Sequence, residues 1–290
     1  MDQFDVIVPS KERIKEDVQH LQEWMSKEPH LPKIEDELWL ETFLFTNKFS
    51  LEKTKFKLEN YYSLRNKYPN ILKNRDPTSP EVLQARQAVT IALSDRLSKD
   101  GTLLLYNKFN ADSTLLNMTD FTKRSFMITD LLLLEHMNFV STCSVVDCRN
   151  INMQHIFKVG MGMSTMTEIF DNAYSERTRS IHLINAPSTV HVMTDLLRKY
   201  LSEKIGDRIF THPPGSRTIF EVIDENIFCS DFGGKGPSFS ELDDYTQNLL
   251  EKNRKWFEEQ DDVCSNELLR RKDSNQVEEL KGSFRKLEVD

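Results

Sequence analysis

Two short segments of this sequence contain residues that serve in known catalytic or phosphate-binding sites. Gly160-Met161-Gly162 has the first two glycines of a phosphate-binding loop, and Asp231-Phe232-Gly233 matches the metal-binding tripeptide of protein kinases. However, Thr165 occupies the third glycine position, and neither a kinase-type strand lysine nor a catalytic loop precedes Asp231. Both segments therefore lack the partners that their chemistry needs.

The other candidate residues for chemistry stand alone. Asp147 ends a strand-like run, where α/β sheets place their sites, but it has no evident partner acid, base or metal ligand. A helix cap or a core ion pair is the commoner role for such a carboxylate. His182 lies in an apolar run, where a hydrogen-bonded core histidine is commoner than a ligand. Because the sequence also lacks GxSxG, HExxH and P-loop motifs, we expect no enzyme activity, no metal and no cofactor.

The composition of the chain indicates which kinds of partner it binds and in which compartment it works. The 290 residues carry a net charge of −8, which argues against a nucleic-acid protein that relies on a diffuse basic field. The 18 Phe and 10 Met suit an ordinary core, and equally a cavity around an oily ligand. No signal peptide, no apolar run near the ~18 residues of a membrane span and no CxxC pair are visible. We therefore expect a cytoplasmic protein with free thiols.

The first ninety or so residues predict an all-helical lobe. Apolar residues at 14, 18, 21 and 25 share one helix face, with Ser10 as N-cap. A second helix is expected around Trp39, and a third from Ser50 to before Pro69. Ser79-Pro80 is a typical start of a fourth helix, because proline at the first helical position loses no hydrogen bond.

From about residue 88 the pattern changes to short apolar runs that alternate with helical stretches. Expected strands lie at 103–106, 143–147 and 181–184, and expected helices at 121–138, 162–174, 190–201 and 239–257, with 220–223 open to either assignment. This alternation predicts an α/β sheet with crossover connections. From about residue 262 the chain is charged and aperiodic, and we expect a weakly packed or partly flexible acidic tail.

Four segments resemble one known family. Residues 181–185 with Pro187 read IHLIN-x-P, and residues 200–209 resemble a PFLxEKIxxRI segment. Asp231-Phe232-Gly233-Gly234 is similar to a terminal EYGG turn, and residues 43–49 resemble an FLRARKF helix, with Phe45, Thr46 and Asn47 replacing arginines and alanine. Along the chain these segments occur in the family's order, over about residues 35 to 240, and they resemble CRAL-TRIO lipid-transfer proteins of the tocopherol- and retinal-binding branch.

The resemblance implies an α/β protein in which an all-helical N-terminal lobe precedes a CRAL-TRIO lipid-binding lobe with a central mixed sheet and a helical gate. We divide the chain into a helical lobe (1–88), a lipid-binding domain (89–240) and a C-terminal helix with an acidic tail (241–290). The implied function is to hold one hydrophobic lipid in an internal cavity and transfer it between membranes. A tocopherol, retinoid, carotenoid, sterol or phospholipid would fit.

The resemblance and the pattern together suggest site residues. Residues 190–201 form an apolar stripe that would close over a ligand and open toward a bilayer. The strand face that points into the cavity depends on a register that the sequence does not give. The cavity and gate candidates are Phe139, Val145, Ile181, Leu183, Val190, Met193, Leu196, Leu197 and Leu201.

Basic residues suggest a docking surface on anionic membranes. Arg177, Arg179 and Lys204 match family positions that contact a phosphoinositide headgroup, and Arg208 occupies the adjacent basic position. Arg208 follows Lys204 by one helical turn, so both can face the same side. The alternative interpretation is a phosphoinositide-binding signalling or scaffold protein that transports no lipid.

Overall fold

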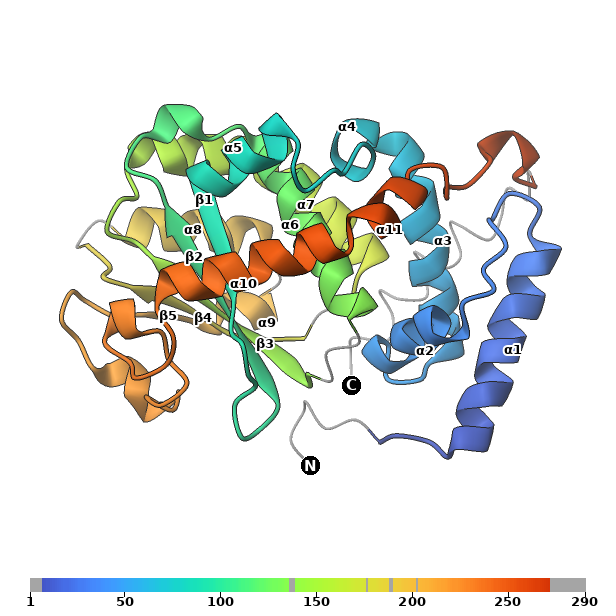
Figure 1. The fold of residues 1–290 in the computed structure, drawn as a ribbon, viewed down its shortest axis with the longest axis horizontal. Coiled ribbons are helices and arrows are strands. Elements are labelled where there is room, and N and C mark those ends of the chain that lie inside the picture. The colour runs from blue at the N-terminus through green and yellow to red at the C-terminus, as the bar shows by residue number, and fades with distance from the viewer. Residues whose placement is uncertain (1–6, 136–138, 176, 188–189, 202, 272–290) are drawn as a thin grey trace.

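The computed structural model describes residues 7–135, 139–175, 177–187, 190–201 and 203–271 (Figure 1). It has a helical lobe at one end and an α/β lobe at the other. The helices are α1 (Lys11–Lys27), α2 (Glu37–Thr46), α3 (Leu51–Lys67), α4 (Pro69–Leu72), α5 (Pro80–Ala88), α6 (Met118–Leu134), α7 (Met153–Ala173), α8 (Val190–Tyr200), α9 (Glu203–Gly206), α10 (Phe239–Lys252) and α11 (Arg254–Glu259). Short 3-10 turns are η1 (Ser113–Leu115), η2 (Thr218–Glu221), η3 (Ser230–Phe232) and η4 (Glu267–Leu269).

The helical lobe forms around an aromatic cluster. The Ser10 hydroxyl caps α1 by accepting from the Arg13 N–H, as the sequence predicts, and Asp36 caps α2 in the same way. Inside the lobe, the Trp39 indole N–H donates to the Tyr62 hydroxyl over 3.2 Å. Trp39 also packs against Phe43, with ring centroids 5.3 Å apart. These contacts hold α2 and α3 together.

The sheet has five strands in the order β1-β2-β3-β4-β5. Its strands are β1 (Val89–Leu93), β2 (Thr102–Phe109), β3 (Ser141–Asp147), β4 (Thr178–Ile184) and β5 (Ile209–Thr211). β1 pairs antiparallel with β2, whereas β2, β3, β4 and β5 are parallel. The predicted α/β fold with a mixed sheet is therefore confirmed.

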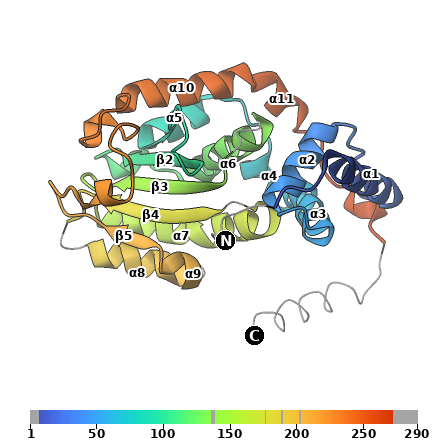
Figure 2. The ribbon, with the colours of Figure 1, turned by 90° about the horizontal axis from the view of Figure 1, so that it is seen from below.

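Helices cover both faces of the sheet, so alternate strand residues enter different environments. Figure 2 shows α10 on one side of the sheet and α7, α8 and α9 on the other. Val145 and Tyr106 point to the α10 side and pack with Phe228 and Leu242. Their neighbours along the strands point to the α7 side, where the sheet becomes the floor of a cavity.

Some elements differ from the sequence prediction. β1 and β5 were not predicted, α7 begins at Met153 rather than near residue 162, and residues 220–223 start within a 3-10 turn rather than a strand or α-helix. The predicted helix over 239–257 is two helices, which meet at Asn253.

The described start of the acidic tail packs more closely than we expected. The Arg65 guanidinium donates to the Val263 carbonyl over 3.3 Å, and the Asn66 amide donates to the Ser265 carbonyl. These contacts tie residues 263–265 to α3. The remainder of the predicted tail, residues 272–290, lies outside the described residues.

Candidate functional site

An apolar cavity of about 300 Å³ lies between the sheet and the helices α7, α8 and α9. Its floor is formed by Ser144, Val146 and Ile181 of β3 and β4. The opposite wall includes Met193 of α8 and Ile205 of α9. We call this space the sheet-floor cavity. Its volume falls at the lower end of the range of small-molecule sites, about 300–1,000 Å³.

One side of α7 supplies much of the apolar lining. Five of its lining residues, Ile156, Val159, Met163, Met166 and Phe170, recur at alternating spacings of three and four. This spacing places them on one helix face. The sequence alone does not identify them as lining residues, because the same pattern is typical of an ordinary core helix. The flexible Met side chains can adapt to ligands of different shape.

The cavity contains few polar groups, and most have partners in the protein. The Asn107 amide donates to the Ser144 hydroxyl over 3.1 Å. His155 accepts from the backbone N–H of Asn152 at its Nδ1, so a neutral ring carries its proton on Nε2. Burial lowers the pKa of His155, and the uncharged ring is thus favoured. The lining suits a ligand that is largely hydrocarbon.

The structure places the predicted gate and cavity residues in four groups. Ile181, Met193 and Leu201 line the sheet-floor cavity. Leu183 and Val190 pack together at its edge, in a cluster that also holds Ile181 and Met193. Leu196 and Leu197 belong to α8, but their side chains lie outside the described residues.

Two predicted lining residues lie elsewhere. Val145 is fully buried on the opposite face of the sheet, because its neighbours Ser144 and Val146 take the cavity side. Phe139 lines a second cavity, between the helical lobe and α6. Neither residue lines the sheet-floor cavity, so the prediction that Phe139 and Val145 line the ligand cavity or form its gate is wrong for this cavity.

The predicted basic residues gather at one end of β4 and β5, but those with described side chains have partners within the protein. Arg177 donates to the Phe45 carbonyl over 2.7 Å. Arg179 forms an ion pair with Asp100 at 2.8 Å. Arg208, just before β5, donates to the Thr178 carbonyl over 2.6 Å. Lys204 lies on α9, but its side chain is outside the described residues.

The catalytic-looking motifs have structural roles. Gly162 lies inside α7, and a Cβ there would come within 2.6 Å of Met118 Cε, so the glycine allows α7 to approach the start of α6. Gly233 has φ +89°, which explains the tight turn after Asp231-Phe232. Asp147 accepts from Arg149 and from Asn185.

His182 belongs to a buried chain of hydrogen bonds on the face of the sheet away from the cavity. Its Nδ1 lies 2.9 Å from His212 Nε2, and its Nε2 lies 2.9 Å from the Ser180 hydroxyl. Burial lowers the pKa of His182 to about 4, and the proximity of His212 adds to this effect. Within the described ranges, no group of three or more His, Cys, Asp or Glu could hold a metal ion.

The fold and the cavity together define an α/β ligand-binding protein whose site suits one largely apolar molecule. Comparison with known families agrees: residues 91–234 match the CRAL/TRIO domain, and residues 10–82 match the Pinta-like UBA domain. The chain belongs to the CRAL-TRIO family, whose members bind and transfer lipophilic ligands and are generally not enzymes.

Individual relatives have low sequence identity to this chain, but the matches cover most of its length. Clavesin-2 of Homo sapiens is 21% identical over 243 residues, covering 81% of this chain and 73% of the relative. Alpha-tocopherol transfer protein-like of Homo sapiens is 21% identical over 257 residues, covering 85% and 74%. The crystal structure of Sfh5 matches with a TM-score of 0.54 at 13% identity, covering 85% of this chain and 99% of that chain. At this identity the last match supports the fold alone.

Proposed function

We propose that this protein holds one hydrophobic lipid in the sheet-floor cavity and transfers it between membranes from the cytoplasm. The observation that carries the proposal is the facing arrangement of Met193, Leu201 and Ile205 on the α8–α9 segment and Ile181 on the sheet, with the cavity between them. Burial of apolar ligand surface stabilises a complex by about 25 cal/mol per Å². Retention is therefore favoured, and release needs a wall that moves.

The moving wall in this proposal is α8 with α9. The main packing partners of α8 are α7 and α9, and the sheet lies beyond the cavity. A rotation of α8 away from β4 would uncover Met193 and open the cavity without disturbing the strands. Among the described residues, no helix has the length and apolar composition needed to cross a bilayer.

An apolar ridge on α7 supports membrane docking beside this wall. Met153, Phe157 and Met161 are spaced four residues apart, and their side chains are 61%, 69% and 69% exposed. Because they share one helix face, they form a continuous apolar ridge. Exposed apolar ridges of this kind enter the interfacial region of bilayers. Since the other side of α7 lines the cavity, docking by the ridge would bring the cavity wall to the membrane.

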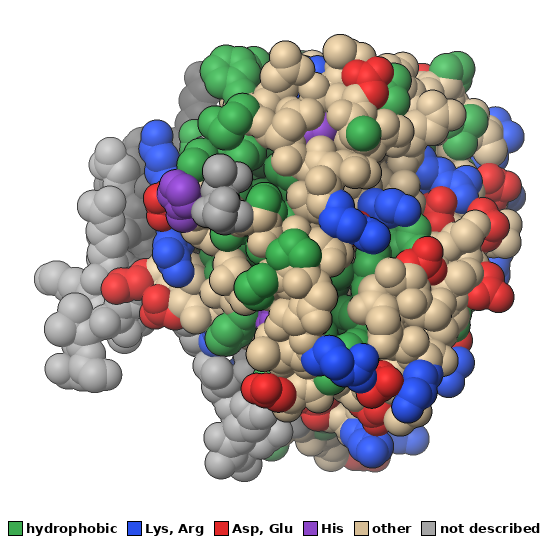
Figure 3. Space-filling view, turned by 90° about the vertical axis from the view of Figure 1, so that its left-hand side faces the viewer, with side chains coloured by type: hydrophobic (Ala, Val, Ile, Leu, Met, Phe, Trp, Pro, Cys, Tyr) green, Lys and Arg blue, Asp and Glu red, His purple; other side chains and the backbone are tan. Residues whose placement is uncertain are grey.

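The basic residues at the start of β4 and around α9 complete the docking proposal. Arg177, Arg179, Lys204 and Arg208 would contact anionic headgroups, and phosphoinositides are the first to test. Figure 3 views a different face, the end of the molecule away from the helical lobe, where hydrophobic side chains are interspersed with basic and acidic ones. The docking residues lie nearer the helical lobe, since Arg177 contacts the Phe45 carbonyl there.

A transfer assay tests this function. A fluorescent tocopherol analogue is loaded in donor vesicles, and its arrival in acceptor vesicles is followed with and without the protein. Tocopherol is chosen because one relative is named alpha-tocopherol transfer protein-like. Protein-dependent transfer that Thr167→Phe abolishes is the expected result, because Thr167 lines the sheet-floor cavity. Tight binding to phosphoinositide vesicles without transfer of any tested lipid class would instead favour the scaffold role.

A further inference from the structure

A second cavity, of about 290 Å³, lies between the helical lobe and the α/β lobe. We call it the interlobe cavity. Its apolar walls come from α2 and the loop after it, from the end of α6 and from the segment just before β3. They include Leu38, Phe45, Phe49, Leu132, Leu133 and Phe139. Among the described residues, none lines both this cavity and the sheet-floor cavity.

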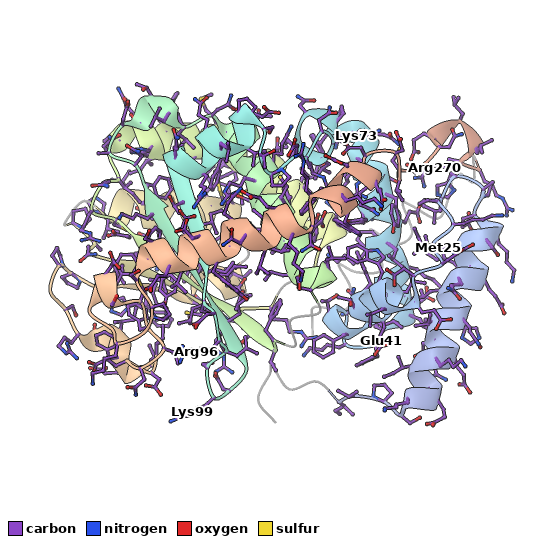
Figure 4. All side chains as sticks on the ribbon, in the orientation of Figure 1. Met25, Glu41, Lys73, Arg96, Lys99 and Arg270 are labelled. Atoms are coloured by element: carbon purple, nitrogen blue, oxygen red, sulfur yellow. The ribbon has the colours of Figure 1, made fainter. Side chains whose placement is uncertain are left out.

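Most polar side chains that line the interlobe cavity already have partners. The hydroxyls of Thr42, Thr46 and Thr129 donate to carbonyls of their own helices. The Ser175 hydroxyl donates to Asn47, and the Tyr174 hydroxyl donates to Asp130. These groups do not need a ligand. Glu41 is exposed on α2, near the junction of the two lobes (Figure 4).

Arg177 is different, because it is a half-buried cation with donors to spare. Its guanidinium donates to the carbonyls of Phe45 and Thr46, and more weakly to that of Val140 at 3.5 Å. These bonds use three of the five N–H donors of an arginine. The remaining donors are available to a ligand at the wall of the cavity.

The charge of Arg177 has no carboxylate partner within the part of the chain that the structure describes. Its guanidinium lies 5.4 Å from the Phe45 ring centroid, and burial alone lowers its pKa. Charged groups taken out of water are normally paired with an opposite charge. Among the described residues, Arg177 therefore has no carboxylate in contact with it, although the exposed Glu41 also lines the cavity.

We propose that the interlobe cavity binds a single-chain anionic lipid, with its carboxylate on Arg177 and its hydrocarbon chain against Phe45, Phe49 and Phe139. A carboxylate can accept a charge-assisted hydrogen bond from one of the two remaining N–H donors, on Nε or Nη1. One cation balances one carboxylate, whereas Glu41 at the same cavity would oppose a polyphosphorylated headgroup. The inference adds a second lipid class to the proposed carrier and does not depend on which lipid the sheet-floor cavity holds.

The test uses cis-parinaric acid, a fatty acid that fluoresces in apolar sites, and its uncharged methyl ester. Titrations of the full-length protein should show tighter binding of the acid by about tenfold to a hundredfold, as expected for hydrogen bonds to a charged group. Arg177→Met should remove this preference while the ester still binds. Ester binding that a further Thr129→Phe substitution removes shows that Arg177→Met keeps the interlobe cavity.

Two matched threonines identify the cavity that is used. Thr129 on α6 and Thr167 on α7 are both half-buried, both hydrogen-bond to their own helix, and each lines one of the two cavities. Thr129→Phe should abolish binding of the acid, and Thr167→Phe should leave it unchanged while impairing the proposed transfer activity.

Two outcomes would overturn the proposal. The first is loss of acid binding in Thr167→Phe but not in Thr129→Phe, which would place the fatty acid in the sheet-floor cavity. The second is an unchanged preference for the acid in Arg177→Met, whether or not this variant also loses binding to phosphoinositide vesicles.

Discussion

The Tyr174 hydroxyl donates a hydrogen bond to Asp130 Oδ1 over 2.8 Å, at a fully buried point where α6 and the end of α7 meet the helical lobe. The other carboxylate oxygen of Asp130 pairs with Arg75 and lies 3.6 Å from Arg65. Arg65 in turn donates to the Tyr61 hydroxyl over 2.7 Å. One carboxylate thus pairs with two buried cations, which α3 and the segment after α4 bring to the junction between the lobes.

Asp130→Asn should strongly destabilise the fold, because it leaves two buried arginines without a counter-charge. Removing one partner of a buried pair typically costs about 3–5 kcal/mol. Urea denaturation followed by circular dichroism measures the loss. Asp243→Asn is the control, because its partner Arg86 is only partly buried and the loss should be smaller. Equal losses in the two variants would show that Asp130 does not hold the junction.

The His182–His212 pair predicts a stability that falls in mild acid. Burial holds the pKa of His182 at about 4 in the folded protein, below the ordinary histidine value of 6.5. Between these values the unfolded chain binds the proton more readily, so unfolding becomes easier as the pH falls from 6.5 toward 4. The slope contributed by one such group is at most about 1.4 kcal/mol per pH unit. In His182→Asn the free energy of unfolding, measured by urea denaturation at a series of pH values, should depend less steeply on pH. An unchanged slope would show that His182 does not cause the loss of stability in acid.

The apolar ridge on α7 predicts a specific loss of membrane binding. Phe157→Ser with Met161→Ser should weaken binding to neutral vesicles in a sedimentation assay, because both side chains are exposed and apolar. The sheet-floor cavity should still retain its ligand, since its lining is on the other side of α7. Leu268→Ser is the control, because Leu268 is 94% exposed on η4, beside the helical lobe. If the control weakens binding as much as the double variant, the ridge has no special role.

The basic residues around α9 predict a selective effect on anionic vesicles. Replacing Lys204 and Arg208 with Gln should weaken binding to phosphoinositide vesicles by about fivefold for each charge, from roughly 1 kcal/mol per basic residue near the surface. Lys99→Gln is the control, because Lys99 is an exposed lysine on the β1–β2 turn, which projects from the body of the molecule (Figure 4). A comparable loss in the control would indicate a general charge effect.

Much of the fold could be predicted because its signals are local. The helical period of residues 14–25 and the Ser10 cap predict α1 correctly, and the IHLIN segment predicts β4. β1 escaped prediction because it follows α5 directly, with no turn residue between Ala88 and Val89. β5 is only three residues long, too short for a periodic signal.

The site was harder to predict because it depends on strand register and on long-range packing. β3 is almost continuously buried, so its sequence does not show that Ser144 and Val146 face the cavity while Val145 faces α10. The partners of Arg177 come from residues 45, 46 and 140, far away in the sequence. Sequence spacing therefore gave the right elements but not the orientation of these side chains.

The most direct test of the central claim is mass spectrometry of an organic extract of the purified protein, with matched extracts of Thr167→Phe and Thr129→Phe. An extract of an unrelated protein purified from the same expression host gives the background of host lipids. We predict one dominant apolar lipid at close to one per chain, which is lost in Thr167→Phe and retained in Thr129→Phe. The reason is that Thr167 lines the sheet-floor cavity, whereas Thr129 lines the interlobe cavity. The same lipid retained at full occupancy in Thr167→Phe would contradict the claim that this cavity holds the cargo.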